Sequence, residues 1–290
     1  MIRIPKWLPG SLLGLLAVLL AARFCWGGAQ MAGGEAQQAQ LPIIMYHHIL
    51  EKSSLLGDYV ITPEQFQTDM EYLKAEGYTT VLPSEVAAYV RGEGELPEKP
   101  VMITFDDGNK STFVYAYPIL ERLGMKAALA VIGIHSETYS LIEDGNVSYA
   151  HATWEELAEM QRSGLIEIGS HTYNLHEESF PRRGTLRKDG ESLQDYRKAL
   201  YEDLSTNQEL LLAATGEYPQ FFAYPFGFID PDADEVLDEL GFDLTLGVAE
   251  RVDTVVLGDL QSAKKLGRFN RPYSARTETF FERVFSQIKA

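Results

Sequence analysis

Short apolar runs alternate with longer amphipathic segments from residue 41 to the end of this 290-residue chain. This alternation predicts parallel strands that are joined by right-handed helical crossovers. We therefore expect an α/β fold in a single domain, built either as a doubly wound sheet or as a β/α barrel. The expected strands are residues 42–47, 79–82, 101–105, 127–133, 165–170, 220–225, 243–248 and 266–270.

Helix signals fill the intervals between these strands. Thr62 is a suitable N-cap before Pro63, and Gly77 is suited to end that helix. Thr153 and Glu156 have the spacing of a capping box at the start of another. The other expected helices are residues 83–92, 111–124, 192–216, 232–241 and 277–288.

The N-terminal segment has the pattern of an export signal. Arg3 and Lys6 precede an apolar run at residues 11–22, which is short for a membrane span. We expect residues 1–29 to be a signal peptide cleaved after Ala29, or alternatively an uncleaved signal anchor. Residues 30–40 are rich in Gly, Ala and Gln and predict a flexible linker, followed by the folded domain at 41–290. The protein is thus expected to be secreted or held at the cell surface, with membrane attachment only through its N-terminal segment.

The net charge of −17 argues against binding of nucleic acid, because phosphate groups require clustered Lys and Arg. The single cysteine, Cys25, excludes an intrachain disulfide.

Three motifs follow expected strands, where functional residues gather in parallel α/β folds. Asp106 and Asp107 follow the strand at 101–105, His171 and His176 follow the strand at 165–170, and the sequence AYPFG occupies 223–227. Residues five apart lie about 140° apart around a helix axis, so the two histidines need a loop in order to converge.

Two imidazoles and one carboxylate form a ligand set for Zn²⁺ or a similar divalent ion. One aspartate would then bind the cation, and the other would accept a proton from water. Each motif taken alone has a simpler interpretation: a capped strand-to-helix turn, surface histidines, or a Pro-Gly turn.

Together the motifs resemble the NodB-homology polysaccharide deacetylases, carbohydrate esterase family 4. The sequences TFDDG and SHTYNLH match the first two motifs of that family. PIIMYHHI and TWEELAEMQRSGLIEIGSHT are similar to the subgroup that acts on poly-β-1,6-N-acetylglucosamine of biofilm matrices. The resemblance covers residues 41–290 and implies a distorted, incomplete β/α barrel.

The resemblance also implies roles for individual residues. Asp106 would be the general base, and the ligands of the divalent metal, Zn²⁺ or else Co²⁺ or Ni²⁺, would be Asp107, His171 and His176. The backbone N–H of Phe226 would help to hold the oxyanion. Thr172 would orient the histidine loop through its hydroxyl.

Two positions depart from the family pattern. Ala223 stands where many members have an arginine that pairs with the base, so Asp106 is expected to lack that partner. Residues 264–273 contain no histidine that could protonate the leaving amine, which leaves His47 and His48 as candidates near the site. We also expect Tyr224 to contact substrate, although aromatic residues at a strand end often belong to the core.

The resemblance thus implies a metal-dependent hydrolase that removes N-acetyl groups from N-acetylglucosamine residues of an extracellular polysaccharide. Peptidoglycan or a chitin-like oligomer is an alternative substrate. The two departures leave open a third alternative, a glycan-binding protein with little turnover.

Overall fold

The computed structural model describes residues 37–52, 54–142 and 144–289, which form one compact unit from Gln37 onward. The expectations for residues 1–29 and for Cys25 lie outside these residues. Within the described ranges, no helix combines the length and apolarity needed to cross a membrane.

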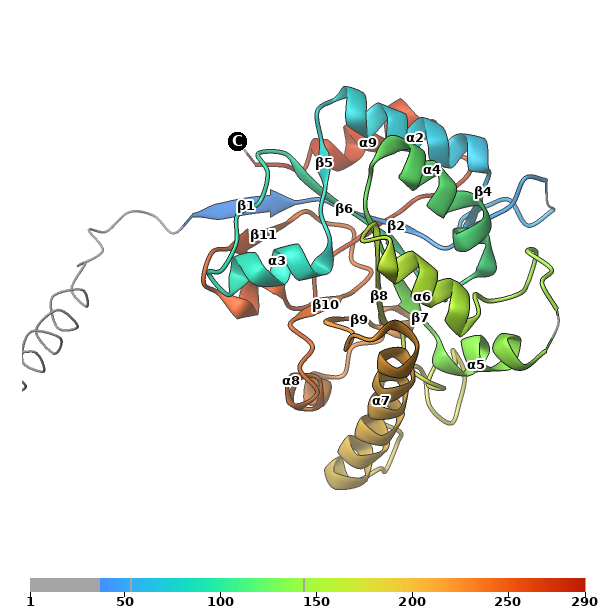
Figure 1. Ribbon diagram of the computed structural model, residues 1–290. Coiled ribbons are helices and arrows are strands. Elements are labelled where there is room, and N and C mark those ends of the chain that lie inside the picture. Colours follow the sequence, from blue (N-terminus) through green and yellow to red (C-terminus); the bar gives the residue numbers. More distant parts are fainter. Residues whose placement is uncertain (1–36, 53, 143, 290) are drawn as a thin grey trace, which may run out of the picture. The chain divides into compact units, whose positions relative to one another are not determined.

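The core of the fold is a curled parallel sheet (Figure 1). In the described part of the chain it has eight strands, seven of them in the order β10-β9-β8-β7-β6-β2-β12, and β5 also pairs with β6. The strand bounds are β2 (Ile43–Tyr46), β5 (Thr79–Thr80), β6 (Pro100–Phe105), β7 (Ala127–Val131), β8 (Ile166–Ser170), β9 (Phe221–Ala223), β10 (Leu244–Leu246) and β12 (Phe269–Asn270). All of the strands that the sequence predicts are present, and the incomplete barrel is confirmed.

The curl brings the two ends of the sheet together. Residues 266–268, just before β12, form backbone hydrogen bonds with the end of β10. Leu266 N donates to Thr245 O (2.9 Å), Gly247 N donates to Leu266 O (2.8 Å), and Arg268 N donates to Ala249 O (3.0 Å). The chain entering β12 is therefore fixed close to the carboxyl end of β10.

Helices surround the strands, and α2, α4 and α9 lie beside one another (Figure 1). Thr62 and Thr153 cap α2 and α6 through their hydroxyl groups, as the sequence predicts. The helix bounds are α2 (Pro63–Ala75), α3 (Pro83–Val90), α4 (Tyr117–Leu123), α5 (Gly133–Leu141), α6 (Trp154–Arg162), α7 (Leu193–Thr215), α8 (Asp234–Glu239) and α9 (Thr277–Phe285). A π-helical turn at Thr112–Ala116 precedes α4, and short 3₁₀ turns occupy Pro225–Gly227, Pro231–Ala233 and Leu260–Ala263.

The sequence missed several elements. Strand β1 (Gln38–Leu41) pairs antiparallel with β11 (Asp253–Val256), so the prediction that the linker extends to residue 40 is wrong at its end. Gln38 and Gln40 alternate with the more apolar Ala39 and Leu41, a period of two that a short strand requires. Also missed were α5 and the two-residue strands β3 (His48–Ile49) and β4 (Val60–Ile61).

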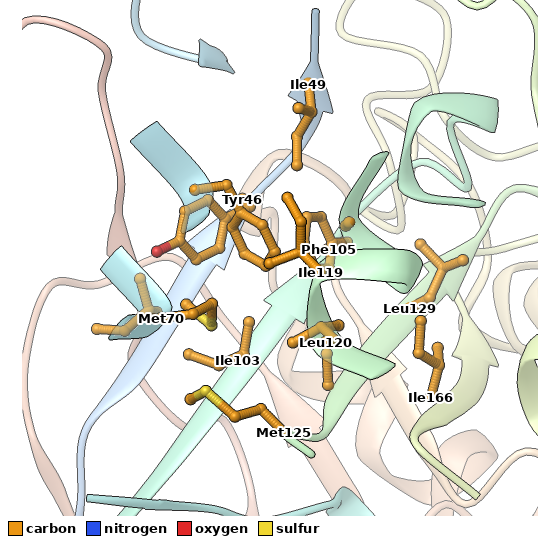
Figure 2. Packing of buried hydrophobic residues seen from close by; sticks show 14 of the residues in the cluster. Tyr46, Ile49, Met70, Ile103, Phe105, Ile119, Leu120, Met125, Leu129 and Ile166 are labelled. Atoms are coloured by element: carbon orange, nitrogen blue, oxygen red, sulfur yellow. The ribbon is translucent and has the colours of Figure 1, made fainter. Parts of the chain in front are cut away.

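The strand that ends at the paired aspartates is anchored in the main hydrophobic cluster. The rings of Tyr46 on β2 and Phe105 on β6 have centroids 5.4 Å apart, and both side chains are buried among aliphatic residues such as Ile119 and Leu120 (Figure 2). Because Phe105 is fully buried, the position of Asp106 is set by the core.

Glu167 on β8 is a buried carboxyl group, 7% exposed. One oxygen accepts a hydrogen bond from Ser84 N (2.9 Å), and the other has no hydrogen-bond partner among the described residues. Burial raises the pKa of Glu167 to about 7; the bonds from Ser84 oppose this rise, and Glu217 and Glu85 add to it.

This raised pKa predicts a pH-dependent stability. The folded pKa lies above the unfolded one, so the contribution of Glu167 to stability is complete below the unfolded pKa and is lost as pH rises through about 7. Glu167→Gln, which stays neutral, is expected to gain about 2 kcal/mol relative to wild type between pH 5 and pH 8.5. Urea unfolding of metal-free protein at the two pH values measures this change, with the exposed Glu121→Gln as control. A Glu167→Gln effect that is equal at both pH values would contradict it.

Candidate active site

Two adjacent carboxylates lie in the turn that follows β6. Asp106 is 3% exposed, and Asp107 adopts φ = 73°, in the left-handed region that a non-glycine residue rarely occupies. Gly108 follows with φ = 77°. This turn allows the two side chains to meet different partners although they are neighbours in the sequence.

The histidines lie in the loop that follows β8. Both carboxylate oxygens of Asp203 on α7 accept backbone hydrogen bonds at 2.8 Å from within this loop, one from Tyr173 N and one from Asn174 N. The Thr172 hydroxyl accepts from Leu175 N (3.2 Å), so that side chain does bind the loop internally. His176 is thereby turned back toward His171, with 4.9 Å between the ring centroids.

Asp107, His171 and His176 converge on one point. One Asp107 oxygen lies 3.7 Å from His171 Nε2 and 3.5 Å from His176 Nε2, and the three ligand atoms lie within 4.8 Å of one another. Ligands at about 2.0–2.1 Å around a tetrahedral Zn²⁺ would be about 3.4 Å apart. The donor set and its spacing therefore fit a divalent ion.

Hydrogen bonding and burial prepare the two imidazoles to bind a cation. His171 Nδ1 lies 2.7 Å from Ala223 O, and because a carbonyl oxygen only accepts, this nitrogen carries the proton and Nε2 is left bare. Burial lowers the pKa of His171 to about 3, so the ring is neutral at neutral pH. Burial also lowers the pKa of His176.

Asp106 is held by a buried arginine. Arg268, fully buried, binds the carboxylate with two parallel hydrogen bonds, Nη1 to Oδ1 at 2.7 Å and Nη2 to Oδ2 at 2.8 Å. Burial alone would raise the pKa of Asp106, but the Arg268 guanidinium together with His171 and His47 outweighs this effect and holds that pKa well below its usual range. Each carboxylate oxygen keeps a second lone pair, so Asp106 can still accept a proton.

Asp107 differs from Asp106 in its charge environment. Burial raises the pKa of Asp107 to about 6, His47 opposes this effect, and the neighbouring Asp106 carboxylate adds to it. A bound cation would stabilise the ionised form of Asp107, whereas the carboxylate of Asp106 is already stabilised by the positive charge of Arg268.

The site opens into a cavity of about 730 Å³. This volume is typical of small-molecule sites. Besides the aspartates and the paired histidines, its walls include Met45, His47, Tyr59, Phe226, Phe228 and Val248. Phe226 packs against His176 with ring centroids 4.4 Å apart, and its φ of 56° is again left-handed.

Most of the residues singled out from the sequence meet at this cavity, but Tyr224 does not. Its side chain is fully buried in a cluster with Phe222 and Phe242, so the expected substrate contact is wrong. Tyr224 lies on the core side of the strand end, whereas Phe226, two residues later, lines the cavity because the left-handed backbone reverses the chain.

The neighbouring residues His47 and His48 differ in position and in hydrogen bonding. His47 lines the cavity, packs against Tyr59 at 4.8 Å between ring centroids, and has no hydrogen-bond partner for Nδ1 among the described residues. His48 is bound through Nδ1 to the Ser111 hydroxyl (2.7 Å) and through Nε2 to Ser148 O (3.1 Å). Of these two histidines, only His47 lines the cavity.

The expectation that Asp106 lacks an arginine partner is also wrong. Arg268 supplies the guanidinium from the segment before β12, while the carbonyl of Ala223 binds His171 instead. A signal was present in the sequence LGRFN, because an arginine within an expected buried strand requires a carboxylate partner.

Comparison with known proteins identifies the family of the chain. The profile of the polysaccharide deacetylase family matches residues 93–245, and the chain belongs to that family of hydrolases. Poly-β-1,6-N-acetyl-D-glucosamine N-deacetylase of Escherichia coli (strain K12) is 26% identical over 222 residues, 69% of this chain and 33% of that protein. The enzyme of the same name from Staphylococcus aureus (strain MSSA476) is 25% identical over 207 residues, 71% of this chain and 67% of that protein. The chain thus spans about a third of the length of the E. coli relative.

Solved structures show the same fold. IcaB from Ammonifex degensii has a TM-score of 0.67 at 27% identity, covering 86% of this chain and 97% of that one. A de-N-acetylase from Aggregatibacter actinomycetemcomitans has a TM-score of 0.71 at 23% identity, covering 84% and 99%. The family resemblance seen in the sequence is confirmed.

The Arg268–Asp106 pair predicts a specific loss of turnover. Arg268→Ala leaves Asp106 buried without a counter-charge, so acetate release is expected to fall about 100-fold or more. Zinc binding should change little, because Arg268 contacts none of the three clustered ligands. Arg268→Lys keeps the charge but loses the paired geometry and should be intermediate. Wild-type turnover in Arg268→Ala would contradict this role for Arg268.

Proposed function

We propose that this protein is a metal-dependent N-deacetylase that acts on N-acetylglucosamine residues of a poly-β-1,6-linked extracellular polysaccharide. The observation that carries the proposal is the division between two adjacent carboxylates. One is paired with a buried arginine, and the other points at two neutral imidazoles. The names of the E. coli and S. aureus relatives support the polymer.

In this proposal Asp107, His171 and His176 hold the ion, Zn²⁺ or else Co²⁺ or Ni²⁺. When bound, a divalent cation polarises the amide carbonyl and makes water at the site more acidic. Asp106, kept ionised and oriented by Arg268, accepts a proton as the water oxygen attacks the carbonyl carbon. The backbone N–H of Phe226 donates to the oxygen that gains negative charge.

His47 is the proposed proton donor to the amine. Breaking the C–N bond requires a proton on nitrogen, which yields acetate and the free amine of the sugar. His47 lines the cavity and packs against Tyr59, whereas both nitrogens of His48 are bonded. This position supplies the acid that residues 264–273 lack.

The site of action is proposed to be outside the cytoplasm, through secretion or surface attachment. The support is the signal-like pattern of residues 1–29 and the polymer named in the relatives. The folded enzyme would be the described unit from Gln37, preceded by the linker.

The substrate can be tested directly. A chain of residues 37–290, which retains β1, would be assayed with Zn²⁺, Co²⁺ or Ni²⁺ on β-1,6-linked and β-1,4-linked N-acetylglucosamine oligomers. We expect faster acetate release from the β-1,6 series. A β-1,4 preference would favour peptidoglycan or chitin-like substrates. Metal binding without acetate from either series would favour a glycan-binding protein and contradict the proposal.

The two aspartate roles can be separated by metal analysis. Asp106→Asn should reduce turnover about 1,000-fold, because a general base is lost, and should still bind one metal per chain. His176→Ala should lose metal, since a ligand is removed. Zinc content after gel filtration measures both variants. Equal metal loss in both would show that the aspartates are wrongly assigned.

A further inference from the structure

The turn that carries Asp107 is held by a segment from outside it. Residues 150–152, just before α6, run antiparallel to the turn and bond to it three times. Lys110 N donates to Ala150 O (2.9 Å), and Ala152 N donates to Gly108 O (2.8 Å). Between these two backbone bonds lies a side-chain bond, from His151 to the turn.

This side-chain bond acts on the main chain of a proposed metal ligand. His151 Nδ1 lies 2.9 Å from the carbonyl oxygen of Asp107. Because that oxygen can only accept, the imidazole donates from Nδ1. The bond satisfies the Asp107 carbonyl in its left-handed conformation, which is unfavourable for a non-glycine residue.

The His151 ring is oriented by helix α5. His135 stacks on it with ring centroids 4.4 Å apart, and Tyr139, one helical turn later, lies 5.7 Å away. These two side chains fix the plane of the imidazole, so its Nδ1 is aimed at one point of the turn.

We propose that His151 is a positioning residue that sets the direction of the Asp107 carboxylate toward the metal. It contacts neither the ion nor substrate, and it acts through the backbone of Asp107. The inference rests on the proposed function, in which Asp107 is a ligand. Outer partners of metal ligands commonly contribute about 10- to 100-fold to metal affinity.

A matched pair of substitutions isolates the hydrogen bond. The side-chain amide nitrogen of Asn lies near the place of the His Nδ1, whereas Leu has similar size and no donor. Both His151→Asn and His151→Leu lose the ring stacking equally, so a difference between them reports the donor. His135→Ala, which removes only the stacked neighbour, is the control.

Zinc affinity would be measured by competition with a chromogenic chelator, together with the visible spectrum of the Co²⁺ form. We expect His151→Leu to bind zinc about 10- to 100-fold more weakly and to shift the Co²⁺ bands. His151→Asn should recover most of the affinity and the wild-type bands. His135→Ala keeps the donor and leaves Tyr139 to orient the ring, so it should weaken zinc binding less than His151→Leu does. His151→Ala replaces the Leu variant if thermal melting shows that the latter does not fold.

Two outcomes would overturn the inference. Wild-type affinity in the Leu variant would show that the hydrogen bond does not matter, and equal weakening in the Asn and Leu variants would assign the effect to ring packing. Failure of the wild-type protein to bind metal is a distinct result. It would remove the proposed function and, with it, the role of His151.

Discussion

The ion pair between Arg268 and Asp106 is the interaction on which the rest of the site depends. Both side chains are withdrawn from water, and such a pair is stable only when its geometry and remaining hydrogen bonds are nearly complete. Arg268 Nε donates to Gly247 O (2.8 Å), so the guanidinium is hydrogen-bonded both to Asp106 and to the backbone that follows β10. Since this arginine comes from the segment that joins β10 to β12, the contacts that close the barrel also fix the position of Asp106.

The Arg268–Asp106 ion pair also determines which partners are available to the Asp107 carboxylate. Because the Arg268 guanidinium is already bound to Asp106, Asp107 is left facing the imidazoles of the loop that follows β8. The site obtains this arrangement from backbone conformations that are individually unfavourable. Asp107, Thr172 and Phe226 all have positive φ, one in each of the three loops that form the site. Asp203, His151 and the core beneath Phe105 supply the contacts that hold two of these loops.

Much of the fold and of the candidate site could be predicted, because the motifs at the strand ends can be recognised in the sequence itself. The periodic apolar runs gave the parallel strands, and the carboxylates and histidines fell at their ends, where a parallel sheet must bring them together. Arg268 could not be placed in the same way, since its partner lies 162 residues away and depends on the curl of the sheet. Tyr224 was misjudged for a related reason. The left-handed backbone at Phe226 turns its side chain out of the core and into the cavity. The alternation of aromatic residues in the sequence does not indicate this change of direction.

The different roles of Asp106 and Asp107 are tested most directly by an anomalous difference map at the zinc edge, from crystals of the zinc-loaded protein. We expect one strong peak about 2.0–2.1 Å from an Asp107 oxygen and from Nε2 of both His171 and His176. Asp106 should remain bound to Arg268 and off the metal. A peak coordinated by Asp106, or none between the two histidines, would contradict it.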